Sequence, residues 1–481
     1  MLFNSFEFIL LFVPCTFLLW TLLRRYYLSG IAVFALLLAS MFFYAYWNPP
    51  FILLLLGSVI VNYVLQRVIY SYTQKNGSFQ QTAKYVMYAG VVLNLVFIAY
   101  FKYKNFILYN VDVLLGRDVA YPALFLPLGI SFFTFQQIAC LVDTYKEKIG
   151  KTSFFDYALF VSFFPQLIAG PIVKYEELIP QIREVSKERL VNWDNVFLGL
   201  TVFTCGLFKK IAIADYLSPV SMMLFDSDVS PTFYDSLLGT LAYTMQLYFD
   251  FSGYSDMALG LGFIFGVTLP QNFNSPYQSL SIIDFWRRWH MTLSGFLKDY
   301  VYIPLGGNGG GLSGKYRNLL LTMLIGGLWH GAGWNYVLWG GLHGVYLVVN
   351  HTFRAWAKGA VAIPRFICWI MTFSAVSFAW IFFRSPSMDR AIDVIAGLAN
   401  ITFTQISFKA ITLSGAELYK FVAALLASIL LAAFAPNAYK LFSKIKANKY
   451  YVAAIGGACF AASLWLMTYT EKVREFLYFQ F

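Results

Sequence analysis

The chain has 481 residues, of which 59% are hydrophobic and only 12% are charged, whereas soluble domains carry about 25% charged residues. A mean hydropathy of +0.63 excludes a soluble globule, and continuous rather than alternating apolar runs argue against a transmembrane β-barrel. The net charge of +11 fits Lys and Arg in cytoplasmic loops and gives no reason to expect a nucleic-acid partner. These properties predict an all-α polytopic protein embedded in the lipid bilayer.

Apolar runs long enough to cross a bilayer recur from one end of the sequence to the other. We predict about eleven transmembrane helices with additional re-entrant or interfacial helices, all in a single domain over residues 1–481. Two of the runs, 234–268 and 318–350, are long enough to bend or to form two pieces. The predicted spans are 6–23, 31–47, 51–70, 85–101, 120–142, 155–170, 194–222, 234–268, 318–350, 364–384, 420–440 and 451–470.

Charged residues predict on which side of the membrane each loop lies, and helix breakers mark one segment that does not cross as a helix. Arg24 and Arg25 follow the first span, which places the N-terminus outside the cytoplasm, and the start of the chain carries Glu7 and lacks the basic region of a signal peptide. The stretch FFPQLIAGPI at 163–172 contains helix breakers, so we expect re-entrant, non-helical backbone that is buried in protein or lines a cavity. Cytoplasmic loops are expected at 71–84, 146–151, 174–189 and 298–317.

Two carboxylates lie inside the apolar stretch FDFSGYSDMALG at 249–260. A carboxylate at membrane depth costs about 2.5–3.5 kcal/mol on insertion scales, so Asp250 and Asp256 each need a partner, water or a proton. We expect the partners to be the arginines at 287–288 or the backbone amides around Gly253. A structural role and a place on a substrate path both remain open for these two residues.

The stretch SIIDFWRRWHMTLSGFLKDY at 281–300 has apolar residues at helical spacing. It carries too many charges to cross lipid, so we predict one amphipathic helix in the cytoplasmic interface or in a protein-lined funnel. Ser281 and Asp284 form a capping-box pattern at its start. Asp284 and Arg288 are four residues apart, which allows an ion pair.

His290 shares one side of this predicted helix with Arg287 and Ser294. An imidazole changes its charge near neutral pH and is therefore suited to proton transfer. An interfacial histidine that is hydrogen-bonded to the backbone would leave the same pattern, and both interpretations stay open.

A second histidine, His330, lies in MLIGGLWHGAGWNY at 323–336, within a long uncharged run. The surrounding glycines either permit close helix packing or open a narrow channel, which Trp329, Trp334 and Trp339 would wall. A histidine at this depth can accept a proton, and desolvation keeps it neutral; a core histidine bonded to a neighbouring helix is the alternative. Further candidates for the substrate path are Arg287, Ser294, Trp329 and Asn335. The histidines expected to be structural or interfacial are His343 and His351.

Several other chemical motifs are absent or incomplete. The glycine-rich stretch at 306–318 contains G-x-x-x-x-G-K, but Tyr316 replaces the Ser or Thr that would hold magnesium and no strand precedes it, so we expect a flexible cytoplasmic loop. The four histidines include no H-E-x-x-H, and no G-x-S-x-G is present, so neither a metal site nor a serine triad is expected. The five cysteines form no C-x-x-C pair and are expected to be inert.

Two histidine motifs occur in this order: F-W-R-R-W-H, and then W-H-G inside an apolar span. Through them the sequence resembles the membrane-bound O-acyltransferase family, close to its bacterial polysaccharide branch. The resemblance implies tilted helices around a central funnel, with a core at about 85–350 and C-terminal helices at 364–481. The stretches that carry it run from residue 1 to 344 and are MLFNSFEFILLFVP, FFPQLIAGPI, FDFSGYSDMALGLGFIFGVTLPQNFNSPY, SIIDFWRRWHMTLSGFLKDYVYIPLGG and IGGLWHGAGWNYVLWGGLHG.

The resemblance also implies the chemistry. His330 matches the histidine that is taken as catalytic in the family, and His290 matches its second histidine. The acyl donor is expected to be a cytoplasmic thioester, either acetyl-CoA or an acylated carrier protein, with no bound cofactor. The acceptor is expected outside: either the polysaccharide itself or a periplasmic or membrane-anchored acetyltransferase partner of the SGNH type, working with the polysaccharide machinery. The residues expected to shape the funnel are Asp250, Asp256 and Arg287.

The resulting prediction is an O-acetyltransferase of the cytoplasmic (inner) membrane that acts on an extracytoplasmic polysaccharide such as an alginate-like exopolysaccharide. The alternatives are D-alanyl transfer to teichoic acid and solute transport, although a transporter usually shows internal repeats, which this sequence lacks. The tail Phe476-x-x-Phe479-x-Phe481 resembles the aromatic C-terminal motif of a small partner protein in teichoic acid D-alanylation. Its last residue is Phe, which has no hydroxyl, so we do not expect a covalent relay on the tail.

Overall fold

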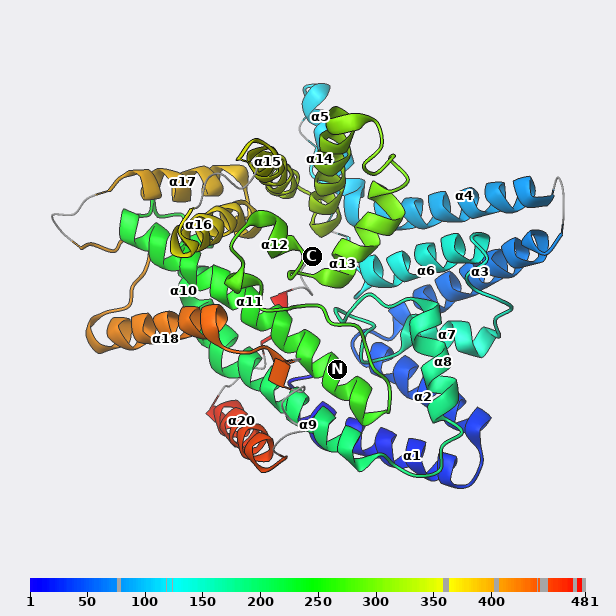
Figure 1. Cartoon of the computed structure of the whole chain (residues 1–481). Coiled ribbons are helices and arrows are strands. Elements are labelled where there is room, and N and C mark those ends of the chain that lie inside the picture. The colour runs from blue at the N-terminus through cyan, green and yellow to red at the C-terminus, as the bar shows by residue number, and fades with distance from the viewer. Residues whose placement is uncertain are drawn as a thin grey trace. The chain divides into compact units, whose positions relative to one another are not determined.

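The computed structural model describes residues 1–75, 79–117, 119–122, 124–357, 363–401, 406–438, 440–441, 449–469 and 474–477. These residues form helices joined by turns and contain no strand (Figure 1), which confirms the predicted all-α class. Two compact units are distinguished, Met1–Thr204 with Tyr254–Pro270 and Cys205–Gly253 with Gln271–Phe481. Two of the boundaries fall within the helices α9 (Trp193–Phe208) and α11 (Phe233–Ile264), and the third follows Pro270, beyond the end of α11.

The helices of the first unit follow the apolar runs of the sequence. One expectation needs correction, because the predicted span at 120–142 becomes helical only after Gly129, which has a positive φ of 70°. The predicted cytoplasmic loop at 174–189 contains a short helix, and its side of the membrane stays a prediction. The elements are η1 (Phe8–Phe12), α1 (Val13–Arg25), α2 (Ser29–Ala45), α3 (Pro50–Thr73), α4 (Phe79–Ile98), η2 (Ala99–Tyr103), α5 (Lys104–Leu114), α6 (Ile130–Tyr145), α7 (Phe154–Ser162), α8 (Tyr175–Val185) and the start of α9.

The stretch at 163–172 has the expected helix break. The preceding helix α7 has nine residues and is therefore about 14 Å long, too short to cross a bilayer. The residues after it are non-helical and buried, and their polar groups find partners within the protein. Gln166 donates to the Phe160 carbonyl oxygen at 2.8 Å, and the Phe164 amide donates to the Ser40 hydroxyl at 3.2 Å. Buried non-helical backbone is thus confirmed, and the re-entrant path stays a prediction.

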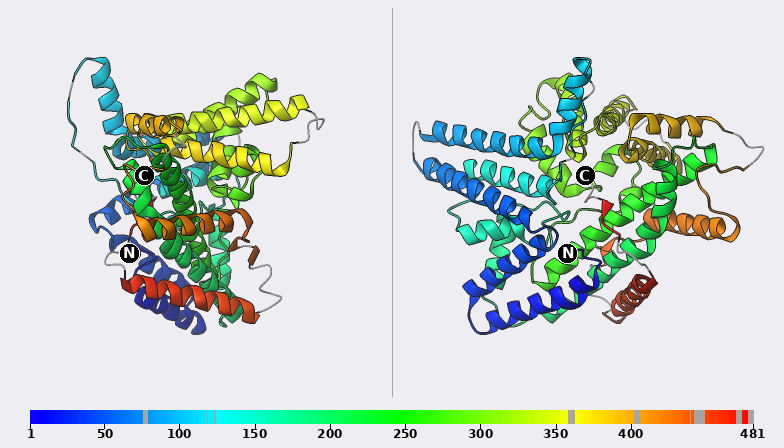
Figure 2. Two further views of the ribbon diagram at one scale, coloured as in Figure 1. Left: turned by 90° about the vertical axis from the view of Figure 1, so that its left-hand side faces the viewer. Right: turned by 180° about the vertical axis from the view of Figure 1, so that it is seen from behind.

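The second unit contains shorter helices between longer ones. Figure 2 shows α18 (orange) and α20 (red) as separate helices, and α20 packs against η3. The elements are η3 (Lys209–Ala214), α10 (Asp215–Phe225), the first part of α11, η4 (Pro276–Gln278), α12 (Ile282–Trp286), α13 (Met291–Leu297), η5 (Lys298–Tyr302), α14 (Gly311–His330), α15 (Trp334–Ala357), α16 (Arg365–Arg384), α17 (Met388–Ala399), α18 (Gly415–Phe434) and α20 (Lys449–Tyr469).

The two longest apolar runs fold differently from each other. The run at 234–268 forms one continuous helix of 32 residues, α11. The run at 318–350 forms two helices, α14 and α15, which are separated at 331–333. Because α14 already begins at Gly311, the expectation of a flexible loop over 306–318 is wrong for its second half.

Membrane-spanning character is clear for several helices. The predicted total of about eleven crossings stays a prediction, because length and hydropathy single out seven segments among the described residues. The helices α11, α14 and α15 are not among these seven. The seven segments are Phe8–Arg25, Pro50–Thr73, Phe79–Leu114, Trp193–Phe225, Arg365–Arg384, Gly415–Phe434 and Tyr450–Thr468.

Candidate functional site

Glycines bring α14 and α15 into close contact in the second unit (Figure 1). A β-carbon on Gly327 would lie 3.0 Å from the Cα of Gly340, and a β-carbon on Gly344 would lie 2.8 Å from a methyl group of Leu320. After α14 ends, the ring of Tyr336 occupies the place where a β-carbon of Gly331 would be. Of the two roles considered for the glycines, the structure therefore favours close helix packing.

His330 is the last residue of α14 and is only 3% exposed. Aromatic rings surround it edge-on, with centroid distances of 4.8 Å to Trp329, 5.0 Å to Trp339 and 5.1 Å to Phe383. Trp334 is 59% exposed, so the predicted wall loses this tryptophan and gains Phe383 from α16. The surroundings exclude water, which strengthens every electrostatic interaction of the imidazole.

His290 interrupts the helix that was predicted over 281–300, so that prediction is wrong. α12 ends at Trp286 and α13 begins at Met291, and His290 between them has left-handed backbone angles, with φ 42° and ψ 54°. A residue with a β-carbon in this conformation costs about 1–3 kcal/mol and persists only where its surroundings impose it. The two helical pieces of five and seven residues are too short to span a bilayer.

Neighbouring residues hold the His290 ring in place. Its Nδ1 lies 3.0 Å from the Oδ1 of Asn272, and the Thr292 hydroxyl donates to the same oxygen at 3.0 Å. The ring of Phe251 packs edge-on against it, with centroids 4.8 Å apart. Burial lowers the pKa of His290 to about 3, so the imidazole is neutral at physiological pH.

The structure brings the two predicted catalytic histidines together. The ring centroids of His290 and His330 are 6.5 Å apart, and Trp329 contacts both rings, at 6.2 Å and 4.8 Å. A hydroxyl within hydrogen-bonding reach of one ring, about 2.6–3.2 Å, would be within one water molecule of the other. The arrangement is therefore suited to moving a proton to or from a small polar group in surroundings that are shielded from bulk water.

The other predicted site residues lie in different surroundings. Asn335 donates to two carbonyl oxygens near the end of α16, at 3.2 and 2.9 Å, and so positions the end of the helix that carries Phe383. Ser294 donates to two carbonyl oxygens of the preceding turn, each at 3.4 Å. Arg287 is exposed, and Asp256 is 8% exposed on the part of α11 that belongs to the first unit. A substrate-path role for these residues stays a prediction.

Local contacts at the start of α12 agree with the sequence analysis. The Ser281 hydroxyl oxygen accepts a hydrogen bond from the Asp284 backbone amide at 3.2 Å. Asp284 pairs with Arg288 at 3.0 Å. Both interactions fasten the segment that precedes His290.

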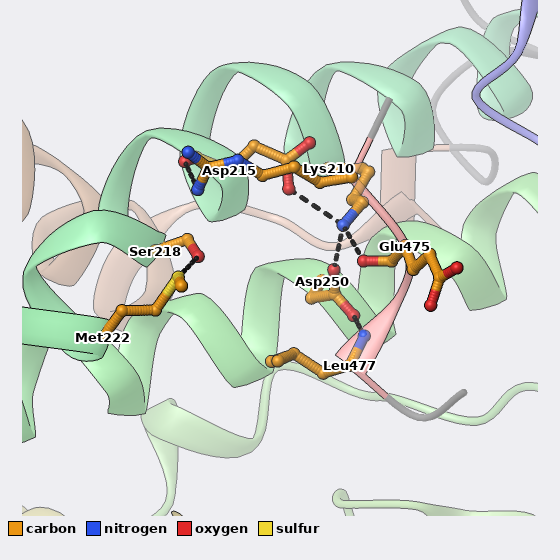
Figure 3. A network of polar contacts seen from close by, with 8 residues as sticks. Lys210, Asp215, Ser218, Met222, Asp250, Glu475 and Leu477 are labelled. Carbon is orange, nitrogen blue, oxygen red and sulfur yellow. Dashed lines mark hydrogen bonds and ion pairs between the residues drawn. The ribbon is translucent and has the colours of Figure 1, made fainter. Parts of the chain in front are cut away.

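Asp250 pairs with Lys210, which corrects the expectation of the arginines at 287–288 or the amides near Gly253 as partners (Figure 3). The Lys210 ammonium lies 2.6 Å from the Asp250 carboxylate and 2.8 Å from the Asp215 carboxylate. Lys210 is 1% exposed and Asp250 is 2% exposed. A lysine in the apolar run at 194–222 needs a partner, so the sequence did contain a clue to this pair.

The C-terminal segment 474–477 docks onto the same pair of charges (Figure 3). The Lys210 ammonium donates to the Glu475 carbonyl oxygen at 3.0 Å, and the Leu477 amide donates to the Asp250 carboxylate at 3.0 Å. Phe476 is 1% exposed, with its ring centroid 4.7 Å from the Lys210 ammonium. The other two aromatic residues of the tail motif, Phe479 and Phe481, lie outside the described residues.

A third histidine belongs to the same aromatic surroundings. His343 is fully buried, and Trp286 donates its indole N–H to the Nδ1 of His343 at 3.2 Å. Its ring lies 5.0 Å from Trp339, which also contacts His330. These contacts agree with the structural role that was expected for His343.

A cationic cluster lies around His351 and consists of Arg287, Lys315, His351 and Arg354. The Lys315 ammonium is 3.4 Å from the His351 Nδ1, and Arg354 donates to the Ser281 hydroxyl at 3.0 Å. Burial, and after it the charges of Lys315, Arg354 and Arg287, lower the pKa of His351. The cluster therefore concentrates positive charge near the start of α14 and the end of α15.

Three contacts of the site were not predicted from the sequence. They are the hydrogen bond between Asn272 and His290, the ring contact between Phe383 and His330, and the ion pair between Lys210 and Asp250. Polar residues in QNFNSPY hinted at a role for Asn272, but no spacing rule connects a loop residue to a side chain 18 positions away. Among the described residues, no group of three or more His, Cys, Asp and Glu side chains could hold a metal ion.

The family model of the membrane-bound O-acyltransferases matches residues 15–383. The chain is 44% identical over 428 residues to a peptidoglycan O-acetyltransferase of Helicobacter pylori, which covers 83% of this chain and 80% of that protein. It is 41% identical over 401 residues to the probable alginate O-acetylase AlgI of Pseudomonas aeruginosa, covering 81% and 73%. It is 29% identical over 273 residues to a teichoic acid D-alanyltransferase of Bacillus subtilis, covering 53% and 68%.

Proposed function

This chain belongs to the membrane-bound O-acyltransferase family and is a multi-pass membrane acyltransferase, and we propose that it transfers acetyl groups for the O-acetylation of an extracytoplasmic polysaccharide. The observation that carries the proposal is the buried pair of His290 and His330, with ring centroids 6.5 Å apart. Relatives named for peptidoglycan and alginate O-acetylation support the acetyl group and the polysaccharide acceptor.

The proposed chemistry is transfer from a thioester to a hydroxyl group. The hydroxyl oxygen attacks the thioester carbonyl carbon, the new C–O bond forms and the C–S bond breaks. The hydroxyl proton passes to the His330 imidazole and from there to the departing thiolate. His290 orients the hydroxyl or shares its proton. Such general acid–base assistance contributes typically 10²–10⁴-fold, and the thioester itself supplies the driving force.

The donor is proposed to be acetyl-CoA or an acylated carrier protein that approaches from the cytoplasm. The cationic cluster supports this proposal, because Arg and Lys side chains attract the phosphate groups that both donors carry. Lys315 precedes His330 by fifteen positions on α14, which corresponds to about 22 Å. A pantetheine arm anchored by its phosphate at the cluster would point its thioester along the helix toward His330.

The proposed location is the cytoplasmic membrane, with the N-terminus on the outer side. Arg24 and Arg25 at the end of α1 support this orientation. On the outer side, the acetyl group passes either to the polysaccharide itself or to a periplasmic or membrane-anchored acetyltransferase of the SGNH type. Such a partner would work with the polysaccharide machinery.

The proposal is tested by measuring base-labile acetate and D-alanine on the envelope polysaccharides of a strain that depends on this protein. Wild type and His330→Ala are compared at equal membrane levels, checked by blotting. We expect acetate with the wild type, its loss with the variant and no change in D-alanine. Unchanged acetate would overturn the proposal. Loss of D-alanine instead would favour teichoic acid D-alanylation, which the Bacillus subtilis relative brings into consideration.

A further inference from the structure

The hydrogen bonds around His290 determine which of its ring nitrogens carries the proton. The Asn272 oxygen that meets Nδ1 at 3.0 Å also lies 3.4 Å from the backbone nitrogen of Thr292. A backbone N–H can only donate, so the Asn272 atom at this place is its carbonyl oxygen, which can only accept. The bond between the ring and the amide therefore requires a proton on Nδ1.

A neutral imidazole has a single ring proton, so a proton on Nδ1 leaves the lone pair on Nε2. We propose that Asn272 is a positioning residue, which fixes His290 in the tautomer whose Nε2 accepts a hydrogen bond from the hydroxyl that reacts beside His330. This inference rests on the proposed acyl transfer and deepens it, because it assigns His290 an accepting role. His290 in this state polarises the hydroxyl before the proton moves.

The same loop fixes the direction of the ring. Two backbone hydrogen bonds close the loop, each 2.9 Å long. The Met291 backbone amide donates to the backbone carbonyl oxygen of Asn272, and the Asn274 backbone amide donates to that of Arg288. These bonds lie on both sides of His290 and hold its backbone at a φ of 42°. Because tautomer and direction are both set before substrate arrives, the ring needs no reorganisation during the reaction.

His343 provides an internal reference with the opposite tautomer. Trp286 meets the His343 Nδ1 at 3.2 Å through its indole N–H, which can only donate. The Nδ1 of His343 is therefore the acceptor, and its ring proton lies on Nε2. Two buried histidines of one unit thus differ in the nitrogen that is protonated.

Nitrogen-15 spectroscopy of the full-length protein in lipid vesicles tests the inference directly. The chain has four histidines, so ¹⁵N-histidine labelling gives few ring signals, and His290→Asn and His343→Gln assign them. At neutral pH we expect a protonated Nδ1 and a non-protonated Nε2 for His290, and the reverse for His343. A His290 proton on Nε2 would overturn the inference. This readout needs no turnover, so it separates the inference from a failure of the proposed function.

Two variants of Asn272 link the tautomer to activity. Asn272→Leu keeps the size of the side chain and removes the acceptor, so we expect a proton on Nε2 of His290 and a kcat lowered about 10²-fold, with KM for the thioester little changed. Asn272→Asp keeps an acceptor and should retain the Nδ1 proton and most of the activity. Trp286→Phe is the matched spectroscopic control, which should change only the His343 signals. Equal losses in both Asn272 variants would refute the positioning role, and the wild-type spectrum decides the tautomer if the Leu variant does not accumulate.

Discussion

Replacement of Lys210 by Met tests the buried ionic contact that joins α11 to the C-terminal segment. Lys210 is 1% exposed and lies 2.6 and 2.8 Å from the carboxylates of Asp250 and Asp215. Without it, two carboxylates face each other and the Glu475 carbonyl oxygen loses its donor. Removing one partner of a buried pair costs about 3–5 kcal/mol, and we expect the upper end of that range here. Asp250→Asn leaves the Lys210–Asp215 pair intact and should cost less, about 1.5–3 kcal/mol.

The free energy of unfolding in mixed detergent micelles, followed by tryptophan fluorescence, measures both variants. Tryptic cleavage after Arg474 reports separately on the C-terminal segment, which should be protected in the wild type and released in Lys210→Met. A Lys210→Met protein that unfolds like the wild type would refute the reasoning. So would a larger loss in Asp250→Asn than in Lys210→Met.

Three further predictions concern the site and the helices around it. His290→Asn keeps a residue that tolerates left-handed angles, so acetyl transfer should fall about 10²–10⁴-fold at a normal protein level; a parallel loss of protein would contradict this. Gly340→Ala places a β-carbon against the backbone carbonyl oxygen of Met323 and 3.0 Å from the Gly327 Cα, so it should destabilise the protein by about 1–3 kcal/mol. In the control Gly341→Ala the nearest contact is a flexible side chain at 3.5 Å, and equal unfolding transitions of the two variants would disprove the packing argument. Arg354→Gln should raise KM for acetyl-CoA at nearly constant kcat in a thioester cleavage assay, and an unchanged KM would remove the support for the donor site.

Local patterns predicted the parts of the structure that local physics controls. Apolar composition gave the helical class, and the length of the apolar run at 318–350 allowed for two pieces, which are α14 and α15. The serine cap of α12 followed from an S-x-x-D pattern. The single helix over 281–300 failed because tertiary hydrogen bonds hold His290 in a left-handed conformation, which no helical periodicity reports.

The polar contacts between residues far apart in the chain could not be predicted from the sequence. Lys210 lies 40 positions from Asp250 and 265 from Glu475, and no spacing rule connects such residues. A search for every charge inside an apolar run would have flagged Lys210 together with Asp215 and Asp250, although not their pairing. The proximity of His290 and His330 was expected only through the family resemblance, and the structure supplies its 6.5 Å geometry.

Thioester cleavage by the purified protein in lipid vesicles, with acetyl thioester and an acetylatable polysaccharide fragment, tests the central claim most directly. His330→Gln keeps a polar side chain of similar size and removes the group that accepts the proton. The account predicts a rate of thiol release that is lower by about 10²–10⁴-fold, with unchanged binding of the thioester. A His330→Gln protein that releases thiol and acetylates the fragment at the wild-type rate would contradict the account, because packing alone would then explain the histidine.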